Sequence, residues 1–246
     1  MGRAFEYRKA SKMARWDKMA KAFSKIGKDI ALAVKAGGPD PDANPALRRC
    51  ILNAKGANMP KDNVERAIKK ASGNDAENYE EITYEGYGQG GVAFFIDCTT
   101  NNPTRTVANV RAIFNKFDGN LGKNGELAFI FDRKGIFSID KSIIKMDWDE
   151  FEMEMIDGGA EDVESDDEEV MITTAFEDFG ALSHKLEELG LEAKSAELQR
   201  IPNIIKEVTE EQFKINMKML ERFEDDDDVQ NVYHNMEITD ELMNTL

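Results

Sequence analysis

The chain has 246 residues and contains 48 Asp and Glu against 32 Lys and Arg, so its formal net charge is −16 at neutral pH. No apolar run approaches the roughly 20 residues that a membrane-spanning helix needs, and the first residues lack the apolar core of a signal peptide. Cys50 and Cys98 lie far apart within apolar patterns, which is typical of buried free thiols in a reducing compartment. We therefore expect a soluble, cytoplasmic protein with more than one domain.

The net charge is divided unevenly along the chain. Residues 1–75 contain 17 Lys and Arg against 8 Asp and Glu, a net charge of +9, whereas the remaining residues contain 15 against 40, a net charge of −25. A polyanion would be attracted to the first part and repelled by the rest. An asymmetry of this size is a functional signal and indicates that the first part binds a nucleic acid.

Three helices are predicted in this basic part, after an arm (residues 3–17) that has too little apolar content to fold without a partner. Apolar residues recur every three or four positions over residues 16–37, which predicts an amphipathic helix. Asn44 and Pro45 predict the start of a second helix, Pro60 the start of a third and Gly73 its end. Together they predict a small helical bundle, because each helix can bury the apolar stripe of its neighbours.

Basic side chains follow the arm and the outward faces of the first and third helices. Such side chains are commonly just solvated, but here the excess covers an arm and two helices of an otherwise acidic chain, which favours phosphate binding. Backbone contacts are better supported than base reading, and a helix-turn-helix reader fits only loosely. The candidate nucleic-acid-binding residues are Arg3, Arg8, Lys9, Lys12, Arg15, Lys18, Lys21, Lys25, Lys28, Lys61, Arg66, Lys69, Lys70 and, beyond the bundle, Arg105.

The rest of the chain is organised around residues 84–131. This segment contains a G-x-G-x-x-G pattern, typical of a dinucleotide-binding loop, at Gly86, Gly88 and Gly91. Such a loop must open a helix, whereas residues 92–100 are β-branched and aromatic and predict a strand. The glycines are therefore predicted to turn a β-hairpin. Arg105 begins the helix that follows, where it could hold a phosphate, but we prefer a structural role in which it braces the loop at residues 119–122.

That helix is predicted to be capped by Thr104 and to be followed by a strand over residues 127–131. Between residues 136 and 201, short strands and helices follow the β-α-β-β-α-β order of a ferredoxin-like unit. Residues 204–246 predict too few elements to fold alone, so we expect them to complete the sheet begun by the hairpin.

Because charge and pattern change near residues 73–78, we expect the basic part to move relative to the rest. The sequence thus predicts an α+β multidomain protein with a basic arm and helical bundle (1–75), a central α+β domain (78–133 and 203–246) and an inserted ferredoxin-like domain (134–202).

Residues suited to catalysis or metal binding are few. His184 lies off the apolar stripe of its helix and His234 ends the last predicted strand, and two Cys and two His are too few for a zinc cluster. The acidic runs at residues 162–169 and 225–228 lack the alternating ligands and central Gly of a calcium loop, so we interpret both as solvated turns. We therefore expect no catalytic residue, no bound metal and no cofactor.

Short motifs spread over nearly the whole chain resemble one known family. They occur in order at residues 40–45 (DPDANP), 57–61 (ANMPK), 84–88 (YEGYG), 102–106 (NPTRT), 119–125 (GNLGKNG) and 227–235 (DDVQNVYHN). They resemble the YebC/PmpR family, which is generally described as bacterial transcriptional regulators and is related to the mitochondrial translational activator of cytochrome c oxidase. The resemblance implies a helical domain, then a central α+β domain interrupted by a ferredoxin-like one. Residues 2–9 depart from the family's usual Gly-His-Ser-Lys-Trp beginning, so contacts specific to that His and Trp are not expected.

The resemblance and the charge asymmetry predict a nonenzymatic nucleic-acid-binding regulator of gene expression, and the family description points to transcription. One alternative is a translation factor or translational activator that binds ribosomal RNA on the ribosome. A nucleotide-binding enzyme is a weaker alternative. The sequence does not separate DNA from RNA as the ligand and leaves the oligomeric state open. It predicts no membrane association, and the acidic domains offer a surface for a basic protein partner.

Overall fold

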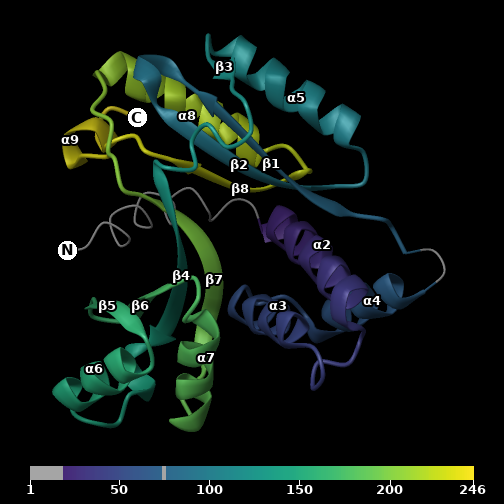
Figure 1. Cartoon of the computed structure of the whole chain (residues 1–246), viewed down its shortest axis with the longest axis vertical. Coiled ribbons are helices and arrows are strands. Elements are labelled where there is room, and N and C mark those ends of the chain that lie inside the picture. Colours follow the sequence, from purple (N-terminus) through teal and green to yellow (C-terminus); the bar gives the residue numbers. More distant parts are fainter. Residues whose placement is uncertain (1–18, 74–75) are drawn as a thin grey trace.

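The computed structural model describes residues 19–73 and 76–246 (Figure 1). The basic part folds as the three predicted helices, α2 (Met19–Gly37), α3 (Pro45–Gly56) and α4 (Lys61–Ser72). Asn44 caps α3 because its side-chain oxygen accepts a hydrogen bond from the N–H of Leu47 at 3.1 Å. Its amide nitrogen donates to the carbonyls of Ala33 and Gly38, each at 2.8 Å, which ties the end of α2 to the start of α3. The buried core between the helices includes Ile30, Leu47, Ala54 and Val64.

The first sheet has the strand order β3-β1-β2-β8, and every pairing in it is antiparallel. Its strands are β1 (Glu80–Tyr87), β2 (Ala93–Thr100), β3 (Asn120–Leu121) and β8 (Val229–His234). Two helices, α5 (Pro103–Lys116) and α8 (Glu210–Glu224), pack on one face of it (Figure 1). Their core with the sheet is rich in aromatic rings and includes Phe94, Phe114, Phe213 and Phe223. The predicted completion of the hairpin's sheet by the last strand is confirmed, and the short α9 (Asp240–Met243) follows.

The glycine-rich segment between β1 and β2 turns a hairpin, as predicted. The N–H of Gly88 donates to the carbonyl of Val92 at 2.8 Å, and a 3₁₀ turn (Gln89–Gly91) lies between them. Gly90 and Gly91 have φ of 72° and 74°, a left-handed conformation that a residue with a Cβ adopts only with strain. A strand rather than a helix follows the glycines, so this segment lacks the helix N-terminus that would receive a pyrophosphate.

Two local predictions in this region are wrong. Residues 124–130 form turns rather than a strand, and the next strand begins only at Phe131. Leu127 is fully buried in this irregular segment. The carboxylate of Glu85 holds the backbone of the segment, because it accepts hydrogen bonds from the N–H groups of Gly125 and Leu127 at 2.6 Å each. The N-cap of α5 is Asn102, which accepts from the N–H of Arg105 at 3.1 Å, and not Thr104.

The second sheet is built from the segment between residues 131 and 202. Its strands β4 (Phe131–Asp140), β5 (Ala160–Ser165), β6 (Glu169–Ala175) and β7 (Ala193–Pro202) are arranged in the order β5-β6-β4-β7, all antiparallel. A 3₁₀ turn (Lys141–Ile143) and helix α6 (Trp148–Asp157) precede β5, and α7 (Phe179–Glu188) precedes β7. The element order is therefore the predicted β-α-β-β-α-β, around a core that includes Phe137, Phe151 and Leu182.

The helical bundle contacts the rest of the chain directly through α3. Helix α3 lies against the edge strand β7 (Figure 1), where the side chain of Asn53 accepts from the N–H of Ala196 at 2.9 Å and donates to its carbonyl at 3.1 Å. Gly56 approaches so closely that an added Cβ would lie 1.9 Å from the carbonyl oxygen of Lys194. An edge strand of the second sheet is thus capped by a helix from the basic part.

The two thiols behave as their apolar surroundings predict. Cys50 and Cys98 are both free and buried, and burial raises the pKa of each to about 12. Both are therefore protonated and unreactive at neutral pH. Among the described helices, none is both long and apolar enough to cross a membrane.

Candidate nucleic-acid interface

The structure divides the predicted phosphate-binding residues into three groups. Arg3, Arg8, Lys9, Lys12, Arg15 and Lys18 lie outside the described residues. An inner group, facing the first sheet, consists of Lys21, Lys25, Lys28 and Arg105. An outer group on α4, facing solvent, consists of Lys61, Arg66, Lys69 and Lys70. Periodicity placed the lysines of α2 and the basic residues of α4 alike on outward helix faces, so their different surroundings are a property of the tertiary structure.

The inner lysines of α2 contact the segment that joins α8 to β8. We call residues 225–228 the acidic turn. The ammonium of Lys21 lies 2.8 Å from a carboxylate oxygen of Asp225 and also donates to the Asp225 carbonyl at 3.2 Å. The ammonium of Lys25 donates to the carbonyl of Gln230 at 3.0 Å, and the Gln230 amide donates back to the Lys25 carbonyl at 3.1 Å. These bonds dock α2 along the acidic turn and the start of β8.

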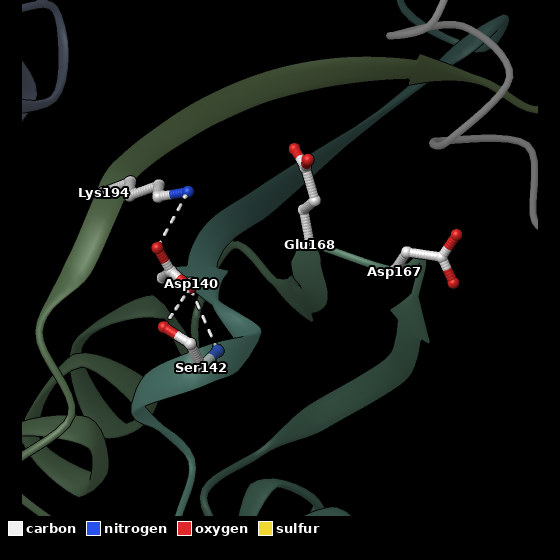
Figure 2. Close-up of a pocket in the computed structure, with 5 residues that line it drawn as sticks. All are labelled: Asp140, Ser142, Asp167, Glu168 and Lys194. Carbon is white, nitrogen blue, oxygen red and sulfur yellow. Dashed lines mark hydrogen bonds and ion pairs between the residues drawn. The ribbon is translucent and has the colours of Figure 1, made fainter.

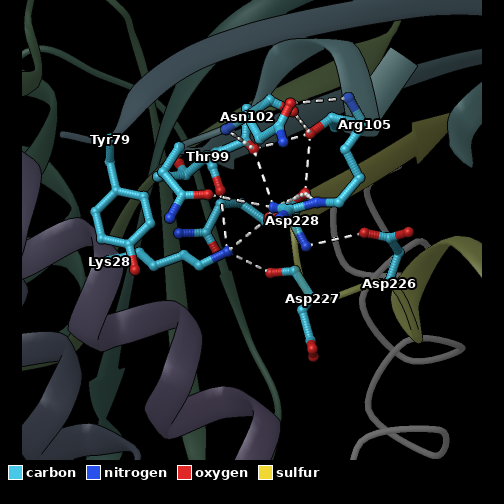
Figure 3. Close-up of polar contacts among 12 residues, drawn as sticks. Lys28, Tyr79, Thr99, Asn102, Arg105, Asp226, Asp227 and Asp228 are labelled. Carbon is cyan, nitrogen blue, oxygen red and sulfur yellow. Dashed lines mark hydrogen bonds and ion pairs between the residues drawn. The ribbon is translucent and has the colours of Figure 1, made fainter. Parts of the chain in front are cut away.

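Lys28 is the buried member of the inner group, with only 9% of its surface exposed. Its ammonium donates to the carbonyls of Thr99 at 3.0 Å and Asp227 at 2.5 Å and lies 3.3 Å from the Asp228 carboxylate (Figure 3). The centroid of the Tyr79 ring lies 5.5 Å from the same nitrogen, in a cation–π contact. With its three donors taken by these partners, Lys28 holds the bundle to the sheet and has no donor left for a phosphate.

Asp228 joins the first sheet, α5 and the bundle at one carboxylate. Arg105 donates to it through Nε at 3.1 Å and through one terminal nitrogen at 2.7 and 3.0 Å, and the hydroxyl of Thr106 donates at 2.9 Å (Figure 3). Asp228 is 4% exposed. Burial raises its pKa, but the hydrogen bonds from Arg105 and Thr106 and the charge of Lys28 outweigh burial and hold the pKa below its ordinary value.

Two sequence predictions are corrected at this carboxylate. Arg105 does not brace the loop at residues 119–122; its guanidinium binds Asp228 instead. Residues 225–228 are not a simply solvated turn, because Asp228 is buried and the side chains of Asp225 and Asp226 bind Lys21 and Asn109. No local pattern in the sequence links the acidic run at residues 225–228 to the lysine-rich helix α2. A signal was present, since Asp228 directly precedes an apolar strand, and a carboxylate that is buried together with such a strand needs basic partners.

The outer group differs from the inner group in exposure. Lys61, Arg66, Lys69 and Lys70 are all exposed on α4. Lys61 lies 3.7 Å from Glu65, with both side chains mostly in solvent, and Lys70 lies 2.6 Å from Glu77. Lys69 has no bonded partner among the described residues. Pairs this exposed contribute little to stability and exchange readily for other anions.

A hollow on the second sheet is lined mostly by carboxylates. It has a volume of about 270 Å³ and is lined by Asp140, Ser142, Asp167, Glu168 and Lys194 (Figure 2). Asp140 accepts hydrogen bonds from the N–H and hydroxyl of Ser142, which hold the pKa of Asp140 below its ordinary value. Lys194 lies 3.4 Å from the same carboxylate. Three carboxylates against one ammonium disfavour a nucleotide here. In the described ranges no three His, Cys, Asp or Glu side chains are grouped so that they could hold a metal ion.

Comparisons with known proteins agree with the motifs found in the sequence. The family model described as TACO1/YebC protein N-terminal domain matches residues 3–74, and the one described as TACO1/YebC second and third domain matches residues 79–236. A probable transcriptional regulatory protein of Flavobacterium johnsoniae is 54% identical over 236 residues, 96% of this chain and 99% of that protein. One from Bacteroides thetaiotaomicron is 54% identical over 239 residues, 96% of each chain.

The fold also has a solved counterpart. A conserved hypothetical protein from Aquifex aeolicus superposes with a TM-score of 0.79 at 38% identity, over 92% of this chain and 93% of that one. The relatives and the two family models cover both the basic part and the two sheets. As its motifs predicted, the chain belongs to the TACO1/YebC family.

Proposed function

We propose that the protein is a nonenzymatic nucleic-acid-binding regulator of gene expression that contacts phosphates through its N-terminal arm and the outer face of α4. The observation that carries the proposal is the exposure of Lys61, Arg66, Lys69 and Lys70 on one helix, in the part of the chain (residues 1–75) that has a net charge of +9. Phosphate contacts of this kind supply affinity without reading sequence. The names of the relatives, probable transcriptional regulatory proteins, support the regulatory role.

The geometry of α4 favours backbone contact over base reading. The guanidinium of Arg66 donates to the carbonyl of Asp62 at 3.1 Å and to the side-chain oxygen of Asn63. Asn63 is the one amide on this helix suited to reading a base edge, and its side-chain oxygen already accepts from Arg66, which leaves it less free to read a base. Contacts limited to phosphates fit structured RNA as well as duplex DNA. This supports the second candidate function, a translation factor that binds ribosomal RNA, beside transcriptional regulation.

The rest of the chain fits the same proposal. We divide it into three domains, with the basic part at 1–75, the central domain at 78–133 and 203–246, and the ferredoxin-like domain at 134–202, and we place the protein in the cytoplasm without a cofactor. The two acidic domains would keep nucleic acid on the basic side and offer a surface to a basic protein. The nucleotide-binding enzyme has less support, since the glycines turn a hairpin and Arg105 is bound to Asp228.

The experiment compares two charge reversals in the full chain. Lys61→Glu with Lys69→Glu alters the outer face of α4, and Lys116→Glu with Lys218→Glu, at exposed positions on α5 and α8, is the matched control. Binding to a duplex DNA and to a structured RNA is measured over a series of salt concentrations. The α4 variant should bind both ligands more weakly, with a salt slope flatter by about two units, roughly one for each lost contact.

The control variant should retain nearly the wild-type slope. Equal losses in both variants would mean that only overall charge matters and would contradict a specific role for α4. Crosslinking in cells, followed by sequencing of the attached nucleic acid, separates the two candidate functions: ribosomal RNA indicates the translation role, and chromosomal DNA the transcription role.

A further inference from the structure

The contact between Lys21 and Asp225 joins a predicted phosphate-binding residue to a carboxylate of its own chain. Lys21 follows the basic arm directly, three positions after Lys18, so a nucleic acid bound along the arm would meet Lys21 next. In the structure its ammonium lies 2.8 Å from the Asp225 carboxylate. A carboxylate, like a phosphate, is an anionic oxygen acceptor. An N–H group of Lys21 that donates to the Asp225 carboxylate cannot donate to a phosphate at the same time.

The inner contacts differ in how easily they can open. The side chains of Lys28 and Asp228 are 11% and 6% exposed, and this pair is reinforced by the bonds of Arg105 and Thr106 to the same carboxylate. The side chains of Lys21 and Asp225 are 39% and 40% exposed. A half-exposed ion pair loses little interaction free energy when the carboxylate is replaced by another anion. A buried ion pair loses much more when it opens, because water does not replace the missing partner. Lys21 can therefore change partner while Lys28 keeps α2 docked.

We propose that Asp225 is an internal competitor of nucleic acid: it occupies Lys21 in the unbound protein and is displaced from it by a phosphate, so that the acidic turn lowers affinity. This inference rests on the proposed function and adds a regulation to it. The competition has a modest size, because a half-exposed pair is weak; freeing Lys21 should raise affinity about two- to fivefold. Because a phosphate displaces Asp225 in the wild-type protein as well, the number of phosphate contacts in the bound state should not change.

The test uses Asp225→Asn and a matched control, Asp227→Asn, in the full chain. Both remove one negative charge from the acidic turn. The carboxylate of Asp227 points away from Lys28 and Arg105 (Figure 3), and only its main-chain carbonyl binds a lysine. The variants are made in the wild-type background and with Lys21→Gln, and each is titrated with a DNA duplex and an RNA hairpin at several salt concentrations. Thermal unfolding of every variant checks that the docking of α2 is retained.

If Asp225 competes, Asp225→Asn raises affinity two- to fivefold with a nearly unchanged salt slope, Asp227→Asn has a smaller effect, and Lys21→Gln removes the difference between them. Equal effects of the two aspartate variants, or a gain that persists with Lys21→Gln, would overturn the competition while binding itself stands. If the wild-type protein binds neither ligand at low salt, the proposed function fails and the competition fails with it.

Discussion

The buried carboxylate of Asp228 gives the sharpest test of how the bundle is held to the first sheet. The substitution Asp228→Asn keeps the shape of the side chain and removes its charge. Lys28 then remains buried without its counterion, and Arg105 loses the carboxylate to which it donates three hydrogen bonds. The matched substitution is Lys28→Met, which removes the buried positive charge altogether and leaves Asp228 with Arg105 and Thr106.

The expected magnitudes follow from what each substitution leaves behind. Removing one partner of a buried ion pair typically costs about 3–5 kcal/mol. The Lys28 ammonium keeps the carbonyls of Thr99 and Asp227 as acceptors, and Arg105 is half-exposed, so we expect about 3 kcal/mol for Asp228→Asn. Lys28→Met leaves two carbonyls without a donor but no unpaired charge, so we expect about 1–2 kcal/mol. The carboxylate should therefore be the more costly side of the pair to change.

Equilibrium unfolding in urea and thermal melting measure both variants against the wild type. For a chain of this size, about 3 kcal/mol corresponds to a melting temperature lower by roughly 6–12 °C. The double variant should be less destabilised than the sum of the two single ones, because the two side chains share one interaction. If Asp228→Asn stays within about 0.5 kcal/mol of wild type, or Lys28→Met proves the more damaging, the buried pair does not hold the bundle as argued.

Three further predictions concern single positions. Burial lowers the pKa of His234 from 6.5 to about 4, so between pH 6.5 and pH 4 the unfolded state binds more protons than the folded state. The free energy of unfolding should therefore fall by up to about 3 kcal/mol as pH drops through this window. His234→Gln should flatten this pH dependence of the unfolding free energy, measured in urea. Gly56→Ala places a Cβ 1.9 Å from the carbonyl oxygen of Lys194 and should lower the free energy of unfolding by about 1–3 kcal/mol. The control Gly180→Ala, in a helix with open space around the glycine, should raise it by up to about 1 kcal/mol. Equal melting temperatures of the two variants would refute the close contact at Gly56. Gly90→Val forces a β-branched residue to a φ of 72° and should cost about 1–3 kcal/mol, and a variant as stable as wild type would show that the hairpin does not need this conformation.

Elements with local signals were predictable from the sequence. Asn44 and Pro45 mark the start of α3 because capping and a fixed φ act over a few residues. The hairpin followed from glycines between two β-prone runs, and the β-α-β-β-α-β order from the regular alternation of short apolar segments. The segment at residues 127–130 was not predictable, because its apolar residues are buried without forming a strand. Its conformation depends on Glu85, a carboxylate about 40 residues away, and no local pattern records that contact.

The candidate interface was predictable in composition but not in arrangement. Helical spacing correctly placed Lys28 away from the apolar stripe of α2, yet it cannot tell a face in water from a face against an acidic turn 200 residues later. The difference matters because Lys28 and Lys61 carry the same charge and serve different purposes: one binds Asp228 at 11% exposure and the other stands in solvent at 87%. Only the long-range pairing of α2 with the segment before β8 separates them.

The net charge of −16 does not by itself oppose binding to a polyanion, because electrostatic interactions between exposed groups are screened within about 8 Å at physiological ionic strength. A phosphate at α4 therefore responds mainly to nearby charges, which are the four basic residues of that helix against Asp62, Glu65 and the neighbouring Glu77. It responds more weakly to carboxylates that lie beyond a screening length from it. Lowering the salt concentration lengthens the reach of those carboxylates, so their repulsion should partly offset the gain in affinity at the outer face. The measured salt slope of the wild-type protein should then be shallower at low salt than a count of its basic contacts gives.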